Sequence, residues 1–105
     1  MIPLSHYLIF SGLLFSVGLA GALIRRNLLV VLMCLELMLS AAGVALVAFS
    51  RAAGTMGLPV YDGQVMALFV VAIAAAEVAI GLALAVSVRR SGKTLDTDGM
   101  NSLKD

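Results

Sequence analysis

The stretch AAAEVAIGLALAV, from Ala74 to Val86, decides the fold because Glu77 is its only charged residue and almost every other position is apolar. The same arrangement occurs in LMCLELMLS, from Leu32 to Ser40, where Glu36 is the single charged residue. A helix that is apolar on all sides either lies in a large protein core or spans a membrane. Both stretches therefore lie either in a large protein core or in a membrane.

The composition of the chain favours the membrane. Of its 105 residues, 62% are hydrophobic and only 12% are charged, and the mean hydropathy is +1.10. A soluble protein this small has too little interior to bury so much apolar surface. Except for Glu36 and Glu77, the charged residues lie between or after the apolar runs. The sequence therefore predicts an integral membrane protein whose first partner is the lipid bilayer.

The charges divide the chain into three apolar runs, each over about 20 residues and so long enough to cross ~30 Å of hydrocarbon. We predict an all-α membrane protein with three transmembrane helices over residues 4–24, 28–50 and 65–88. A β-barrel would need strands with alternating apolar and polar residues, and these runs do not alternate. Residues 1–105 then form a single membrane domain, whose polar tail over 89–105 we expect the fold not to need.

The basic residues predict the orientation of the helices, because cytoplasmic loops carry an excess of lysine and arginine. The second loop, expected over residues 51–64, carries one basic residue, Arg51. The other basic residues near the runs lie in the first loop or after the third run, namely Arg25, Arg26, Arg89, Arg90 and Lys93. We therefore expect the N-terminus to lie outside and the C-terminus to lie in the cytoplasm.

The two glutamates lie deep in the predicted helices. With a rise of 1.5 Å per residue, Glu36 is roughly 13 Å from Asn27 and Glu77 is roughly 18 Å from Arg89. An acid near the bilayer midplane costs about 2.5–3.5 kcal/mol on insertion scales. A structural hypothesis is that each is protonated and hydrogen-bonds a neighbouring helix, which returns only roughly 1 kcal/mol. The functional hypothesis, which we favour, is that desolvation favours the neutral carboxyl enough for it to take up and release protons.

Small and polar residues follow the glutamates at helical spacing, which allows close approach of another helix or a water molecule. In the first run the same spacing relates Gly12 to Ser16. Three helices alone would bury these stripes poorly, so we expect the chain to be part of a larger assembly. The stripes on the second and third runs combine Glu36 with Ser40 and Gly43, and Glu77 with Ala74 and Gly81.

Three motifs make the chain resemble a known family. They are RRN at residues 25–27, LELML at 35–39, and GQV followed by AAAEVAIGLA at 63–65 and 74–83. Residues 6–88 resemble the K subunit (mitochondrial 4L type) of respiratory complex I, the proton-pumping NADH:quinone oxidoreductase. That family has three helices with the N-terminus outside, in agreement with the topology expected from the residues.

The resemblance implies roles for four residues. Glu36 and Glu77 match the two membrane glutamates of the family, which belong to the axis that carries protons or charge from the quinone end of the complex. Arg25 and Arg26 match its pair of arginines in the cytoplasmic loop, where topology anchoring is the simpler explanation. The sequence departs from the family at Ser40 and Gly43, where many relatives have asparagine.

The resemblance also implies the setting. The enzyme complex uses NADH, flavin, iron–sulfur clusters and quinone, but a subunit of this type has no redox site, and the sequence contains no ligand set for any of these cofactors. The implied partners are the antiporter-like and neighbouring small membrane subunits, with no nucleic acid. The implied location is the bacterial inner membrane, as a multi-pass protein.

Two other classes remain open on the residues. Cation/proton antiporters that are built from several proteins have a related small component, the C-type component, which also has three helices, although the RRN and AAAEVAIGLA motifs favour complex I. A small multidrug/proton exchanger also uses an intramembrane glutamate, but it has four helices, with the glutamate in the first and an aromatic lining. Here the first run has no acid and the chain has no tryptophan.

Overall fold

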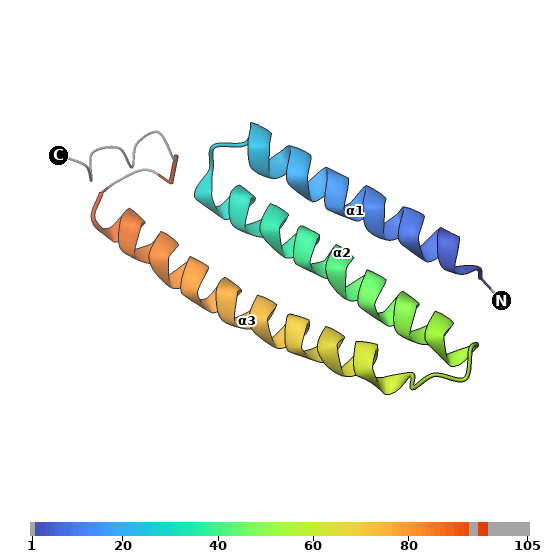
Figure 1. The fold of residues 1–105 in the computed structure, drawn as a ribbon. Coiled ribbons are helices and arrows are strands. Elements are labelled where there is room, and N and C mark those ends of the chain that lie inside the picture. Colours follow the sequence, from blue (N-terminus) through green and yellow to red (C-terminus); the bar gives the residue numbers. More distant parts are fainter. Residues whose placement is uncertain (1, 93–94, 97–105) are drawn as a thin grey trace.

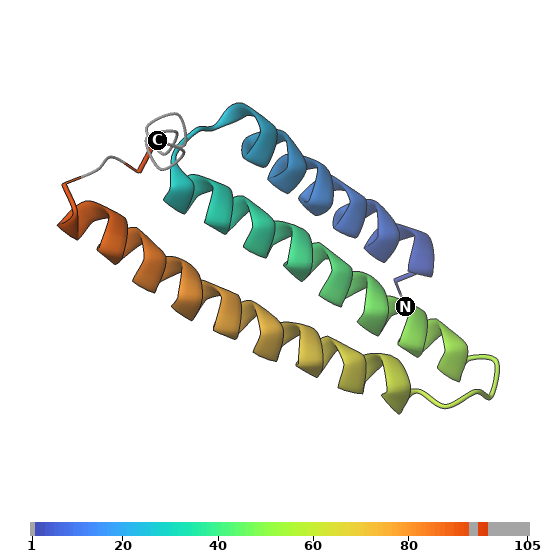
Figure 2. The same cartoon turned by 60° about the vertical axis from the view of Figure 1, so that its left-hand side comes forward.

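A computed structural model describes residues 2–92 and 95–96 of the chain. It contains three long helices, α1 (Leu4–Ile24), α2 (Leu28–Gly54) and α3 (Tyr61–Arg90). They lie side by side in one layer, each antiparallel to the next, with α2 in the middle (Figures 1 and 2). All three are long and apolar enough to cross a membrane. The described part of the chain thus confirms the all-α class and the three helices.

The helix bounds differ from the predicted ones at the loop between α2 and α3. Helix α2 continues to Gly54 rather than ending at residue 50, and α3 begins at Tyr61 rather than at 65. Arginine and alanine are good helix formers, so the helix continues through Arg51 although the apolar run has ended. The chain turns between them, where Gly57 has a φ of 77° and Pro59 follows it. The connection is therefore shorter than the predicted 51–64.

The opposite end of the layer joins three segments. The Asn27 side chain caps α2 by accepting a hydrogen bond of 2.9 Å from the N–H of Leu29. The N–H of Leu28 donates to the carbonyl oxygen of Leu95 at 2.9 Å, and Asn27 forms a β-bridge with Asp96. A segment beyond α3 therefore returns to the first loop, and that the fold does not need the tail stays a prediction.

The predicted tail over 89–105 begins later than expected, because Arg89 and Arg90 still belong to α3. Its residues 93–94 and 97–105, which include Lys93, lie outside the described part of the chain.

Small residues bring α1 and α2 together. The Ser11 hydroxyl donates to the carbonyl oxygen of Ala41 at 2.6 Å. A Cβ atom at Gly18 would lie 2.8 Å from the carbonyl oxygen of Cys34, so only glycine permits this backbone approach. Gly21 packs against the Cys34 sulfur. In a membrane, such close contact between backbones replaces the hydrophobic driving force that holds soluble helices together.

The stripe expected on α1 does not take part in this contact. A Cβ atom at Gly12 would meet no atom within 4 Å, and the exposed Ser16 hydroxyl donates to the Gly12 carbonyl oxygen of its own helix at 2.7 Å. Gly43 on α2 is equally open. Gly81, by contrast, lies against Leu32 in the contact between α2 and α3. The stripe on α1 and Gly43 on α2 therefore make no close helix contact within the chain, as expected of stripes that three helices alone bury poorly.

Candidate functional site

The contact between α2 and α3 places the two glutamates at the same depth. A Cβ atom at Gly81 would lie 2.6 Å from Leu32 Cδ2, which aligns these two positions across the contact. The helices are antiparallel, so four residues forward from Leu32 and four residues back from Gly81 lead to the same level. Those positions are Glu36 and Glu77. Both acids therefore lie about 6 Å along the helix axes from the Leu32–Gly81 contact.

The same geometry turns the two acids toward opposite faces of the layer. Four residues exceed one 3.6-residue turn by about 40°. Both helices are right-handed. The side-chain direction therefore rotates in the same sense about both helix axes when both are followed toward the same end of the layer. Because Leu32 and Gly81 point toward each other, equal rotation carries Glu36 to one face and Glu77 to the other. We call these the Glu36 face and the Glu77 face.

Two separate hollows confirm this arrangement. The hollow at Glu36, of about 470 Å³, lies between α2 and α3 and is otherwise lined by Leu29, Leu32, Met33, Leu37, Ser40, Val78 and Leu82. The hollow at Glu77, of about 350 Å³, also touches α1 and is otherwise lined by Phe15, Leu35, Met38, Leu39 and Ala42. The two acids therefore do not line a common hollow. Side chains of the contact between α2 and α3 lie between the two hollows.

Glu36 is half-buried, and its carboxyl is incompletely satisfied. The Oε1 atom is buried and has no hydrogen-bond partner among the described residues. The Ser40 hydroxyl, in the same hollow, donates to the Glu36 backbone carbonyl oxygen at 2.9 Å rather than to the carboxyl. A buried oxygen without a partner costs about 1–3 kcal/mol. The Glu36 carboxyl therefore needs a proton of its own, a water molecule or a donor from outside the chain.

Glu77 is exposed on the surface of the single chain. Its neighbours in the hollow are apolar side chains. In a bilayer an acid at this depth is costly against lipid. The Glu77 face therefore requires a cover of protein or water, as does the Glu36 face.

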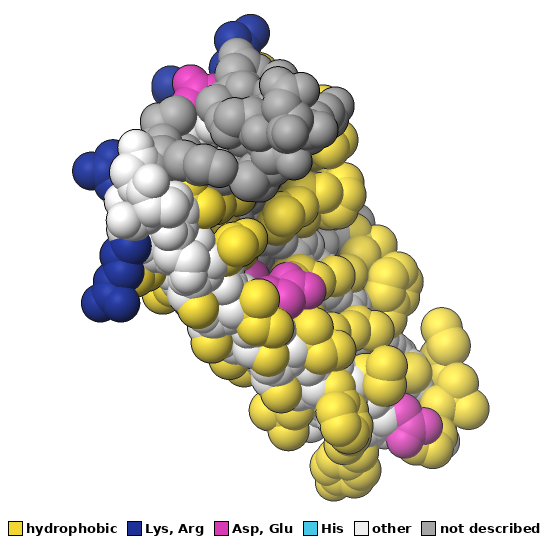
Figure 3. All heavy atoms as spheres, turned by 90° about the vertical axis from the view of Figure 1, so that its left-hand side faces the viewer, with side chains coloured by type: hydrophobic (Ala, Val, Ile, Leu, Met, Phe, Trp, Pro, Cys, Tyr) yellow, Lys and Arg dark blue, Asp and Glu magenta, His cyan; other side chains and the backbone are white. Residues whose placement is uncertain are grey.

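The arginine pair lies far from the two acids. Arg25 ends α1, where its N–H donates to the Gly21 carbonyl oxygen at 2.9 Å, and both Arg25 and Arg26 are exposed. The pair lies at the end of the layer where α3 also ends, and the basic side chains visible in Figure 3 gather at this end. Nine residues of α2, or roughly 13 Å, separate this level from Glu36. The structure thus brings Glu36 and Glu77 to one level but does not bring the arginines to them.

A family comparison decides the class of the chain. The family of NADH-ubiquinone/plastoquinone oxidoreductase chain 4L matches residues 6–105. The chain belongs to this family. The match confirms the resemblance inferred from the RRN, LELML and AAAEVAIGLA motifs.

Two curated relatives are similar to this chain over nearly their whole length. The NADH-quinone oxidoreductase subunit K of Akkermansia muciniphila is 63% identical over 105 residues, which are 100% of both chains. The subunit K of Methylacidiphilum infernorum is 50% identical over 103 residues, covering 98% of this chain and 97% of the relative. Both relatives are subunits of an enzyme complex. The similarity favours the complex I family over the antiporter component, and this chain is a small multi-pass membrane subunit.

The residues of this chain do not fit an iron–sulfur cluster. Such a cluster is held by four thiolates, whereas the chain has one cysteine, Cys34. The Cys34 sulfur packs against Gly21 in the contact between α1 and α2. Among the described residues, no group of three or more His, Cys, Asp or Glu side chains could hold a metal ion.

Tyr7 and Arg51 were not among the predicted site residues. The Arg51 guanidinium donates a hydrogen bond of 3.2 Å from Nη1 to the Tyr7 hydroxyl. The signal in the sequence was the lone basic residue after the second apolar run, but its partner lies 44 positions away and follows only from the packing of α1 on α2.

Proposed function

We propose that the chain is a membrane-arm subunit of proton-translocating NADH:quinone oxidoreductase, in which Glu36 and Glu77 carry protons or charge. The observation that supports this most is their position at one depth on opposite faces of a single helix layer. A carboxyl on each face can exchange a proton with a different neighbour. The chain then relays charge across its own layer, between the part of the complex that reduces quinone and the antiporter-like subunits.

The contact between α2 and α3 beside the two acids suits such a relay. One helical turn from both acids, α2 and α3 meet through Leu32 and Gly81, and an apolar contact keeps the local dielectric low. A small movement of a neighbouring helix then changes the surroundings of each carboxyl. The Glu36 Oε1 atom, which has no partner among the described residues, is the group that accepts a proton or a hydrogen bond from the Glu36 side.

The proposal includes the setting of the chain. Its 105 residues form one domain of the bacterial inner membrane, with the N-terminus outside and the C-terminus in the cytoplasm, as the distribution of basic residues indicates. Antiporter-like and neighbouring small subunits cover the two glutamates. NADH, flavin, the iron–sulfur clusters and quinone are bound by other subunits of the complex.

Infrared difference spectroscopy of the assembled complex tests the proposed role of Glu77. We expect a protonated-carboxyl band that changes during turnover and is lost in Glu77→Gln, with a second such band lost in Glu36→Gln. We also expect coupled proton pumping to fall less in Glu77→Gln than in Glu36→Gln, because Glu36 has Ser40 in its hollow and a buried Oε1 atom without a partner among the described residues. A Glu77 that stays ionised throughout turnover would contradict the proposal and leave a fixed charge in its place.

Arg25 and Arg26 give a separate prediction. We propose that the pair supports proton entry or the binding of a neighbouring subunit at the cytoplasmic loop, in addition to anchoring the topology. Replacing both with lysine keeps the positive charge but removes planar bidentate hydrogen bonding. We expect normal insertion, with coupled activity lowered severalfold when measured in membrane vesicles. Unchanged activity would assign the pair to topology alone.

A further inference from the structure

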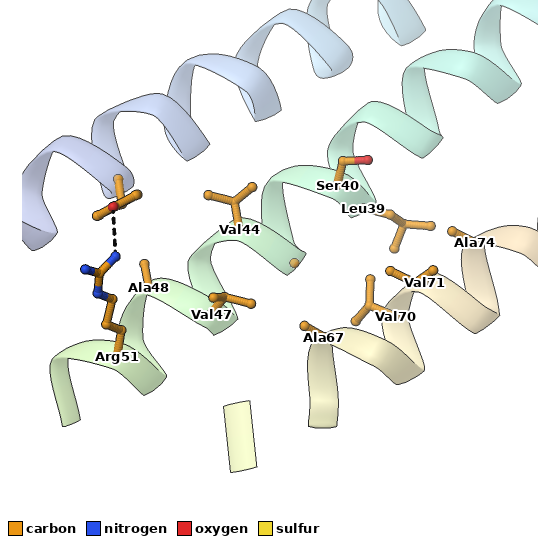
Figure 4. A pocket seen from close by; sticks show the side chains of 12 residues that line it. Leu39, Ser40, Val44, Val47, Ala48, Arg51, Ala67, Val70, Val71 and Ala74 are labelled. Atoms are coloured by element: carbon orange, nitrogen blue, oxygen red, sulfur yellow. Dashed lines mark hydrogen bonds between the residues drawn. The ribbon is translucent and has the colours of Figure 1, made fainter. Parts of the chain in front are cut away.

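A groove on the Glu36 face continues from the glutamate toward the loop between α2 and α3. It has a volume of about 460 Å³ and runs over α2 beside α3, from the level of Ser40 to Arg51 (Figure 4). We call it the Arg51 groove. Its walls are short aliphatic side chains from both helices, including Val44, Val47, Val70 and Val71.

The polar groups of the Arg51 groove lie at its two ends. At the inner end, the Ser40 hydroxyl is already used in its bond to the Glu36 carbonyl oxygen. At the outer end, Arg51 is exposed and uses one guanidinium nitrogen to bind Tyr7. A guanidinium has five N–H donors, so it can donate to an anion as well. The occupant of the groove therefore has to be apolar along its length and anionic at the Arg51 end.

The length of the groove matches one leaflet of a bilayer. Ser40 and Arg51 are eleven residues apart on α2, or about 16 Å along its axis. Half of a hydrocarbon core of ~30 Å is about 15 Å. Tyrosine and arginine at the outer end are also the side chains that bind at the level of the lipid headgroups, where a tyrosine ring is half in hydrocarbon and an arginine reaches out to water.

We propose that the Arg51 groove binds one acyl chain of a phospholipid, whose phosphate accepts hydrogen bonds from Arg51. Guanidinium and phosphate oxygens form short, charge-assisted and often bidentate hydrogen bonds. The acyl chain covers the aliphatic walls and ends beside Ser40, one helical turn from Glu36. A partner helix is the competing occupant, and the experiments below distinguish it from a lipid. The proposal does not depend on proton transfer by Glu36 or Glu77.

Native mass spectrometry of the purified complex tests the proposal through the number of retained phospholipids. Gly43 lines the groove and a Cβ atom there would meet nothing within 4 Å, so Gly43→Leu fills the groove without a clash. Gly12→Leu is the matched control, because Gly12 is equally open but lies outside the groove. We expect Gly43→Leu and Arg51→Gln to lose one phospholipid per complex, and Gly12→Leu and Arg51→Lys to keep it. Equal retention in all variants would overturn the proposal.

A photochemical experiment on the otherwise unaltered complex separates lipid from protein. A diazirine-bearing aliphatic residue in place of Val47, which is 40% exposed and lines the groove, reacts with whatever occupies it. An adduct with the mass of a phospholipid supports the proposal, even if the groove variants fail to assemble. A covalent product with another subunit would show that a partner helix fills the groove and would overturn it.

Discussion

Glu36→Gln in the assembled complex is expected to leave the set of subunits unchanged while lowering coupled proton pumping and quinone reduction by about a hundredfold. Glutamine keeps the size and hydrogen bonding of the side chain but cannot titrate, and positioned acid–base groups typically contribute 10²–10⁴-fold. Glu36 has a buried Oε1 atom without a partner among the described residues. We therefore expect a larger effect of substitution at Glu36 than at Glu77. Proton uptake and NADH-driven quinone reduction in vesicles, normalised to the amount of assembled complex, measure the effect.

A second-site variant controls for nonspecific damage. Ser40 lies one turn beyond Glu36 and lines the same hollow, so Glu36→Gln combined with Ser40→Glu returns an acid to the Glu36 face. We expect part of the coupled activity to return. Failure of this rescue would mean that the position of the acid within the hollow matters, whereas full coupled activity in Glu36→Gln alone would return Glu36 to a structural role.

Gly81→Leu is expected to have the largest effect among substitutions that change no charge. A Cβ atom at position 81 would lie 2.6 Å from Leu32 Cδ2 and 2.9 Å from Leu32 Cδ1. Leucine adds three further carbon atoms, and overpacking of this kind costs about 1–3 kcal/mol. Either the Leu32 side chain must turn away or α2 and α3 must separate, one turn from both acids. We expect the yield of assembled complex, or its coupled activity, to fall severalfold, as measured by native gels and vesicle assays.

Three variants make the Gly81 result specific. Gly12→Leu is the same substitution at a glycine where a Cβ atom meets nothing within 4 Å, and Leu84→Ile alters the exposed side of the same helix. Both are expected to assemble and to work normally. Leu32→Ala removes the side chain that the new leucine meets, so the double variant Gly81→Leu with Leu32→Ala should regain assembly. Normal assembly and activity in Gly81→Leu alone would contradict the close contact between the two helices.

Much of the fold could be predicted from the sequence because membrane insertion depends on local properties. A run of apolar residues longer than the bilayer is thick forms a helix wherever it lies, since backbone groups in lipid must bond within the segment. This is why α1 begins and ends where the apolar run does, and why Glu36 and Glu77 could be singled out from their surroundings alone. The motifs around them were also sufficient for the family.

The end of α2 was less predictable because hydropathy marks where the lipid ends rather than where the helix ends. Arg51 closes the apolar run, yet helical hydrogen bonding continues to Gly54. Small residues also look alike in the sequence, although Gly18 meets the Cys34 backbone and Gly12 meets nothing. The two glycines lie on different sides of α1. In a helix that is apolar on all sides, the hydrophobic pattern does not show which side contacts another helix.

By itself, then, the sequence determined the membrane class, the number of helices, the two intramembrane acids and the family. Only the tertiary structure decided that Glu36 and Glu77 lie at one depth on opposite faces, and that Arg51 meets Tyr7 at the end of an apolar groove. These relations depend on the register and rotation of one helix against another. Register and rotation are set by a few close contacts, such as Gly81 against Leu32, between residues far apart in the chain. Apolar periodicity cannot encode them, because lipid solvates every side of such a helix almost equally well.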